Sequence, residues 1–210
     1  MPTVRIRPVL AMGLALLGAC ASRAADQPPP VPEPLMTAGL AGAAVIVTPL
    51  TMVLAEPGLP EGSLPADRVV LLAWADSLIG RLVVERAPEV RWVLPPELRR
   101  VARRSPGLVA DPDQMGQAVL RQASLRTVPD PLRGYLRNLM AVAGGGRHAF
   151  VPAAVAFSPD SIPGQVQAWM AAVLADGRSG AILWRTEVRA TGATPSAALA
   201  AAFAVIFPVQ

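Results

Sequence analysis

The feature that most constrains the fold is a pair of apolar runs around a short polar turn within Gln165–Thr191. The second run alternates with period two, with Ile182 and Trp184 on one side and charged side chains between apolar ones. This pattern predicts a strand with one buried and one solvent-exposed face. The turn Asp176–Gly180 contains Gly, Asp and Ser, the residues that short hairpin loops favour. We predict an antiparallel hairpin in which Leu174 pairs with Ile182 and Trp184 is anchored in the core.

The remaining apolar runs place this hairpin in a larger sheet. An apolar run at 43–47 predicts a strand buried on both faces, and helical spacing predicts a helix from a cap at Ser63 to about Arg86. The later expected elements are a strand at 90–94, a helix at 95–104, a Pro-rich insertion at 105–131 with a short helix near 114–122, a helix at 131–142, a strand at 149–157 and a last helix capped by Thr194-Pro195.

This order predicts an α/β (α+β) fold with a single mixed β-sheet of about five strands and helices packed on its faces. The early strands need helical crossovers, whereas the later ones can be joined by turns. The sheet is expected to end in the antiparallel hairpin, followed by a C-terminal helix.

Residues 1–19 have the pattern of a bacterial export signal. Arg5 and Arg7 give a positive start, and Val9–Leu17 is an apolar run too short to span a bilayer. The run ends in the letters LGAC, which resemble the lipobox of bacterial lipoproteins. The resemblance implies cleavage between Ala19 and Cys20 and acylation of Cys20, on its thiol and its new amino group, by fatty acids such as palmitate.

Two alternatives to this lipoprotein signal are an ordinary secretory signal with a chance cysteine and an uncleaved anchor. Against both, Cys20 is the only cysteine and stands where the motif demands it, and it leaves no internal disulfide. Ala21 follows, where an Asp would favour the inner membrane, so the resemblance implies the periplasmic face of the outer membrane. Residues 20–36 are expected to be a Pro-rich tether, and residues 37–210 the folded periplasmic domain.

Three segments together resemble the small α/β domain of bacterial periplasmic lipoproteins: VIVTPL, EVRWVLPPELRR and VLADGRSGAILWRTEV. Similar domains occur at the amino terminus of the Tol translocation protein, in the curli-secretion lipoprotein and in penicillin-binding-protein activator lipoproteins. The resemblance covers most of residues 43–207, and the insertion at 105–131 departs from it. It implies a protein that binds or assembles with other envelope proteins, without a shared catalytic residue.

Residues able to carry catalysis are few and isolated. His148 is the only histidine, so no second His and no nearby Cys can complete a metal site with it. The glycine run 144–146 lacks the Lys of a phosphate-binding loop and is typical of a helix stop. Asp111 and Asp113 could form an acid–base pair, but Asp-Pro-Asp is a common turn, and Asp176 is expected to bond its own backbone. We therefore expect no catalytic residue, metal or cofactor.

The net charge argues against nucleic acid as a partner. All 19 basic residues are Arg, and the formal charge of +4 falls to +2 when Arg5 and Arg7 leave with the signal. A surplus this small does not favour nucleic acid without a focused patch.

Positive charge is concentrated in residues 81–147, which contain twelve Arg and six acidic residues. On the helix at 95–104, Arg99 and Arg103 are spaced i,i+4, and so are Arg100 and Arg104. Such like-charge pairs are tolerated more easily near an anion, such as a lipid phosphate or an acidic partner. These four arginines are the candidate anion- or partner-binding residues, and a solvated Arg face is the alternative.

Three functions follow from these observations. The leading one is a non-enzymatic membrane-anchored lipoprotein that binds or scaffolds cell-envelope machinery from the periplasmic face. The second is a subunit of an oligomeric envelope secretion or transport assembly, which as a pore would need long amphipathic membrane hairpins that the sequence does not contain. The third is a small hydrolase, which the lack of any catalytic constellation disfavours.

Overall fold

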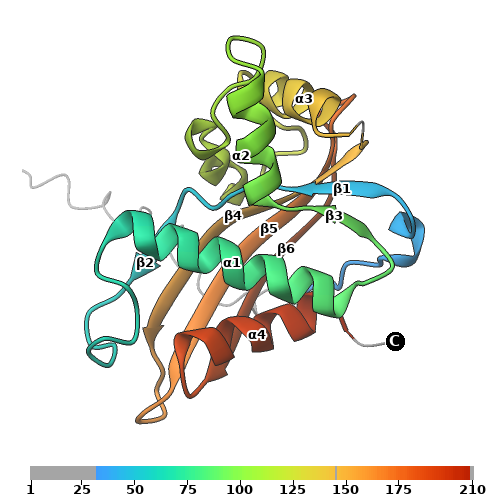
Figure 1. Cartoon of the computed structure of the whole chain (residues 1–210). Helices are drawn as coiled ribbons and strands as arrows, with labels where there is room; N and C mark the ends of the chain where they lie inside the picture. The colour runs from blue at the N-terminus through green and yellow to red at the C-terminus, as the bar shows by residue number, and fades with distance from the viewer. Residues whose placement is uncertain (1–31, 145, 209–210) are drawn as a thin grey trace, which may run out of the picture. The chain divides into compact units, whose positions relative to one another are not determined.

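The computed structural model describes residues 32–144 and 146–208, so Ala19 and Cys20 lie outside the described residues. The described chain forms a six-stranded mixed sheet with helices packed on it, which confirms the predicted α/β class (Figure 1). The strands are β1 (Ala44–Val47), β2 (Val53–Ala55), β3 (Arg91–Val93), β4 (His148–Pro159), β5 (Val166–Asp176) and β6 (Ile182–Gly192). The helices are α1 (Arg68–Arg86), α2 (Pro95–Arg104), α3 (Leu132–Val142) and α4 (Pro195–Ile206), with 3₁₀ helices η1 (Ala38–Leu40), η2 (Pro112–Gln114) and η3 (Gln117–Arg121).

The main strand order is β3-β1-β4-β5-β6. Strand β1 is parallel to both β3 and β4, whereas β5 is antiparallel to both β4 and β6. Strands β1 and β3 are connected through α1, and β3 and β4 through α2 and α3, whereas the three long strands follow one another through turns, as their directions require.

Strand β2, which the sequence did not predict, lies on the same side of β4 as β1. Ile46 of β1 pairs with Ala149, and Leu54 of β2 pairs with Ala156 farther along the same strand. Between the two strands stands Pro49, which has no N–H to donate to the ladder. The chain therefore leaves β4 at this proline and returns to it at β2.

The β5–β6 hairpin forms as predicted, but the predicted register is wrong. Leu174 pairs with Trp184, and Ile182 lies opposite Ala175, with a register shift between these two pairs. One extra residue in β6 moves Ile182 to the face opposite Trp184. The two residues consequently contact different hydrophobic clusters.

Backbone pairing with the insertion explains this shift. The N–H of Ile182 donates to the carbonyl of Arg126 at 3.0 Å, and the N–H of Val128 donates to the carbonyl of Gly180 at 2.8 Å. The start of β6 is therefore held by a segment about fifty residues earlier in the chain, which a local hairpin pattern cannot reveal.

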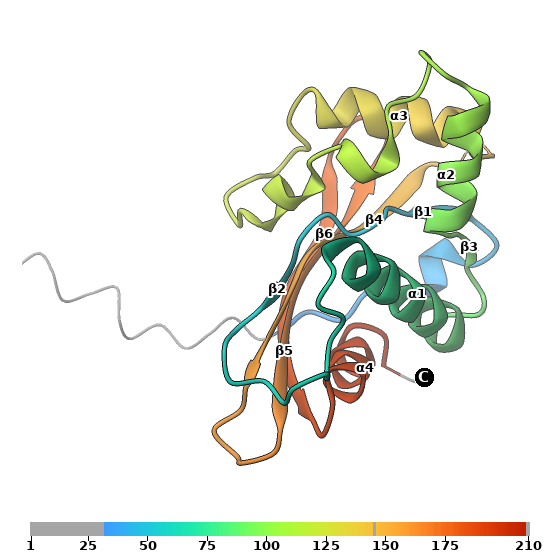
Figure 2. The ribbon, with the colours of Figure 1, turned by 60° about the vertical axis from the view of Figure 1, so that its left-hand side comes forward.

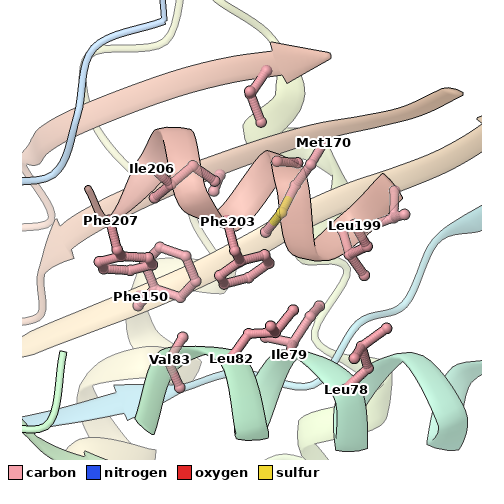
Figure 3. Packing of buried hydrophobic residues seen from close by; sticks show 14 of the residues in the cluster. Leu78, Ile79, Leu82, Val83, Phe150, Met170, Leu199, Phe203, Ile206 and Phe207 are labelled. Carbon is pink, nitrogen blue, oxygen red and sulfur yellow. The ribbon is translucent and has the colours of Figure 1, made fainter. Parts of the chain in front are cut away.

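The sheet is buried on both faces by two separate cores. The even-numbered face of β5 packs on α1 and α4, where Ile79 and Leu82 face Phe203 (Figure 3). The opposite face packs on α2, α3 and the insertion, through residues such as Leu136 and Val173. The sequence predicted helices on the faces of the sheet, but not the contribution of the insertion to the second core, because this irregular segment carries no periodic apolar pattern. Figure 2 shows α1 and α4 side by side against the sheet, with α3 at the top of the view, away from them.

One of the two predicted helix caps is confirmed, and the other is wrong. Thr194 accepts the N–H of Ala197 at 3.1 Å, so it caps α4 as predicted. The N-cap of α1 is Asp67, whose side chain accepts the N–H of Val70 at 2.9 Å, and not Ser63. The residues from Ser63 to Asp67 are not helical and mostly form bends, so the helix begins later than predicted.

Trp184 is half-buried rather than fully enclosed in the core. Its ring stacks on Phe150 with centroids 6.3 Å apart, and its Nε1 donates to the carbonyl of Glu33 at 3.1 Å. Leu35 is buried, and its N–H donates to the carbonyl of Ile206 at 2.8 Å. The last residues of the predicted tether therefore pack on the domain.

Trp184→Ala should lower the free energy of unfolding by about 2–3 kcal/mol, which is less than for a fully buried aromatic residue. Trp184→Phe should lose the bond to Glu33, worth about 0.5–1.5 kcal/mol, and part of the packing of the larger indole ring. Urea unfolding of both variants measures the two costs. Equal stability of Trp184→Ala and the wild type would show that the contact with Phe150 contributes nothing.

Candidate functional site

The break between β1 and β2 directs a backbone amide toward helix α1. The N–H of Leu50, next to Pro49, donates to Oδ1 of Asp76 at 2.7 Å. Asp76 lies on the inward side of α1 and is 5% exposed. A buried carboxylate therefore takes the place that a neighbouring strand would otherwise fill.

Arg99 of α2 joins this carboxylate to the insertion. Its Nη2 forms an ion pair with Oδ2 of Asp76 and a second one with Asp113 of η2, at 2.7 Å. Its Nε also donates to both carboxylate oxygens of Asp113, at 2.9 and 3.1 Å. Asp113 is held in turn because its N–H donates to Asp111 at 3.0 Å. One guanidinium thus connects α1, α2 and the insertion.

Burial and pairing act in opposite directions on these charges. Burial raises the pKa of Asp76 above its ordinary value, against the opposing effects of the Leu50 N–H and the Arg99 guanidinium. The hydrogen bonds that Arg99 donates to Asp113 and Asp76 raise the pKa of Arg99, so it stays charged. All three side chains are committed to one another, which indicates a structural junction rather than a free acid and base.

Two cavities open on either side of this junction, where α1 and α2 lie next to each other (Figures 1 and 2). The larger, of about 710 Å³, is lined by Leu50, Val69, Leu72, Asp113 and neighbouring residues. The smaller, of about 580 Å³, is lined by Gly80, Val84, Leu94, Pro95 and Pro96, among others. Ala73 and Arg99 line both cavities. We call the two cavities together the α1 groove.

The four candidate arginines do not form a single set. Arg99 is held by two carboxylates, and Arg100 forms an ion pair with Glu97. Arg103 and Arg104 are exposed at the end of α2, and neither has an ion pair among the described residues. Only the last two arginines therefore present unpaired charge to solvent in this part of the structure.

The other residues considered for chemistry have local roles. The side chain of Asp176 accepts hydrogen bonds from the N–H groups of Ser179 and Arg178, at 2.9 and 2.8 Å. It also forms an ion pair with Arg147 at 2.6 Å. These bonds, that of Ser179 first, lower the pKa of Asp176 and confirm that it bonds its own turn.

Gly146 is needed because a Cβ there would lie 2.5 Å from the carbonyl oxygen of Ala44. Burial lowers the pKa of His148 and so favours the neutral ring, while the nearby Asp176 carboxylate acts in the opposite direction.

Sequence reasoning missed Asp76, although a signal was present. Asp76 is spaced with Leu72, Ile79 and Val83 on the apolar side of α1, where an unpaired carboxylate would be costly. A charged residue at such a position predicts a buried partner, but not which one.

The described residues include neither a candidate metal cluster nor a candidate membrane-spanning helix. Among residues 32–144 and 146–208, no three His, Cys, Asp or Glu side chains come together as they would around a metal ion. In the same residues, no helix combines the length and the apolar character needed to span a bilayer.

The sequence matches no protein-family model and no curated protein. Similar solved structures include the LpoB C-terminal domain from Salmonella enterica, at 15% identity and TM-score 0.40, covering 71% of this chain and 82% of that one. Lipoprotein GNA1162 from Neisseria meningitidis matches at 12% identity and TM-score 0.39, over 71% and 83% of the two chains. A PelC dodecamer from Paraburkholderia phytofirmans matches at 12% identity and TM-score 0.39, over 85% and 93%. One of these three is named a lipoprotein.

Arg99→Ala should lower the free energy of unfolding by about 3 kcal/mol, because it leaves the buried Asp76 without its counter-charge. The value lies at the low end for broken buried ion pairs, since the Arg99 side chain is 25% exposed. Arg103→Ala, one turn farther along the same helix, should change stability by less than about 0.5 kcal/mol. Thermal or urea unfolding compares the two, and equal losses would contradict the proposed role of the junction.

Proposed function

We propose that this chain is a lipoprotein, held by acylated Cys20 at the periplasmic face of the outer membrane, that binds an extended segment of an envelope protein in the α1 groove. The LGAC motif supports the location, as does the position of the chain's only cysteine within it. The binding function rests on one observation, the exposed valines of α1 beside two open cavities. In this proposal the protein is not an enzyme, and it acts by holding its partner near the membrane.

The floor of the α1 groove is one continuous face of the helix. Val69, Ala73, Gly80 and Val84 fall within about 60° of the helix circumference at 3.6 residues per turn. Val69 is 74% exposed and Val84 is 47% exposed, although both are apolar. Large apolar side chains that remain in water beside a hollow favour a partner that covers them.

The length of the groove fits a peptide better than a small molecule. Helix α1 has 19 residues and is about 28 Å long, which matches an extended segment of about eight residues. The cavities are open rather than enclosed, and their polar rims carry both signs of charge, including Arg68 and Arg81 against Asp111 and Glu85. Such a mixed rim suits a segment with apolar side chains and polar ends, and not a polyanion.

Cys20→Ser tests the anchor. The resemblance to the lipobox implies several acyl chains on Cys20, and a single chain alone gives only reversible binding. The variant should keep residues 1–19 and carry no acyl mass, whereas the wild type should begin at an acylated Cys20 and fractionate with the outer membrane. Intact mass and membrane fractionation measure both. A wild-type chain without acyl mass on Cys20 would end the lipoprotein proposal.

Val84→Asp tests the groove. The position is exposed, so stability should change by less than about 1 kcal/mol, while a carboxylate in an apolar contact should weaken partner binding at least about tenfold. The matched control is Val205→Asp, at an exposed valine on α4. A photo-crosslinking residue at Val69 should capture a discrete partner in the native envelope, less so with Val84→Asp and unchanged with Val205→Asp. Equal capture in all three chains would show that the groove is not the binding site.

A further inference from the structure

The region that contains α2, α3 and the β5–β6 turn carries more positive charge than its own carboxylates neutralise. Its acidic residues are Glu97, Asp111, Asp113, Asp130 and Asp176. All but Asp111 are ion-paired, with Arg100, Arg99, Arg133 and Arg147 respectively.

The exposed arginines left over lie on connected segments. The N–H₂ group of Asn138, on α3, donates to the carbonyl of Leu108 at 3.3 Å, so α3 contacts the loop that follows α2. The β5–β6 turn packs on α3 as well, because a Cβ at Gly180 would lie 2.5 Å from Arg133. We call this region the basic surface, and its exposed arginines without an ion pair among the described residues are Arg103, Arg104, Arg126, Arg137 and Arg178.

An exposed apolar side chain stands within this positive region. The loop after α2 projects beyond the helices in Figure 1, and Leu108 in this loop is 61% exposed. Arg103 and Arg104 precede it on α2, and Arg137 is next to its hydrogen-bonding partner on α3. A projecting leucine among spread-out cations is typical of a surface that meets the interface of an anionic bilayer.

We propose that the basic surface lies against anionic lipid headgroups of the membrane, with Leu108 entering the interface. This proposal rests on the proposed function for the presence of a membrane anchor. From Cys20 to Pro32 the chain has twelve residues, so an extended Pro-rich tether would span about 37 Å. A tether of that length would let the domain turn one of its surfaces toward the bilayer while Cys20 stays anchored. Each Arg near an anionic surface strengthens membrane binding about fivefold at low salt. An acyl anchor and a basic surface together give stable attachment, whereas a single acyl chain gives only reversible binding.

The experiment uses the full-length lipidated protein with Leu108→Cys, labelled with a polarity-sensitive fluorophore. Because Cys20 is the only natural cysteine and its thiol would be acylated, the introduced cysteine is the single free thiol. The protein is anchored in phosphatidylcholine vesicles with and without phosphatidylglycerol. The fluorophore emission should shift to the blue only with phosphatidylglycerol, and the shift should disappear at high salt because exposed charges are then screened.

Charge reversal gives the decisive comparison. Arg103→Glu with Arg104→Glu should abolish the blue shift and weaken the docking equilibrium at least about 25-fold. Arg91→Glu with Arg189→Glu changes the net charge equally at two exposed arginines outside the basic surface and should leave the shift intact. Equal effects of the two pairs, or equal emission in neutral and anionic vesicles, would overturn the proposal. A shift that needs added envelope protein would also overturn it, in favour of an acidic protein partner.

The anchor is measured separately by flotation with phosphatidylcholine vesicles alone. Failure to float there would count against the lipoprotein proposal, while the difference between neutral and anionic vesicles would still report on the basic surface. The two proposals can therefore fail independently.

Discussion

One backbone amide connects the sheet to the helices that cover it. Pro49 interrupts the pairing with β4, and the N–H of Leu50 bonds to the buried carboxylate of Asp76. A buried carboxylate needs a counter-charge, which Arg99 supplies while also holding Asp113. Breaking one such buried pair costs about 3–5 kcal/mol, a large part of the roughly 5–15 kcal/mol that stabilises a domain. The positions of α1, α2 and the insertion are therefore coupled.

The long strands β4 and β5 make two cores possible. Both strands are rich in alanine. On one face, aromatic side chains supply the volume that the alanines lack, such as Phe150 of β4 and Phe203 and Phe207 of the C-terminal segment. Phe150 lies 5.7 Å from Phe207 and 6.1 Å from Trp92, measured between ring centroids. The small strand residues let helices approach closely, and the aromatic cluster fills the remaining space. Charged residues alternate along β6, at the edge of the sheet, and discourage edge-to-edge pairing with another sheet.

The sequence predicted those parts of the structure that depend on local periodicity. The hairpin, α2 and the Thr194 cap all follow from spacing and turn chemistry within a few residues. The register of β6 could not be predicted, because it depends on the pairing of Arg126 and Val128 with the start of the strand. Strand β2 has only three residues and no pattern that distinguishes it from a loop.

The residues around the α1 groove show even more clearly which contacts the sequence alone does not predict. Asp76 could have been noticed as a charge on an apolar helix face, but its partners lie 26 and 23 residues away, at Leu50 and Arg99. The sequence grouped Arg99 with Arg100, Arg103 and Arg104 because the four share one helix. Only the packing of α2 against α1 and the insertion separates the buried guanidinium from the exposed ones.

The contacts of Glu33 and Leu35 determine how the domain would carry a mechanical load. A pull on the preceding residues would first meet the hydrogen bond from Trp184 and the one to Ile206. Both partners belong to the C-terminal part of the chain, in β6 and α4. Tension applied at the N-terminal side would thus be distributed into the long-strand end of the sheet before it could peel β1 away. These two hydrogen bonds would therefore protect the short strand β1 from direct force.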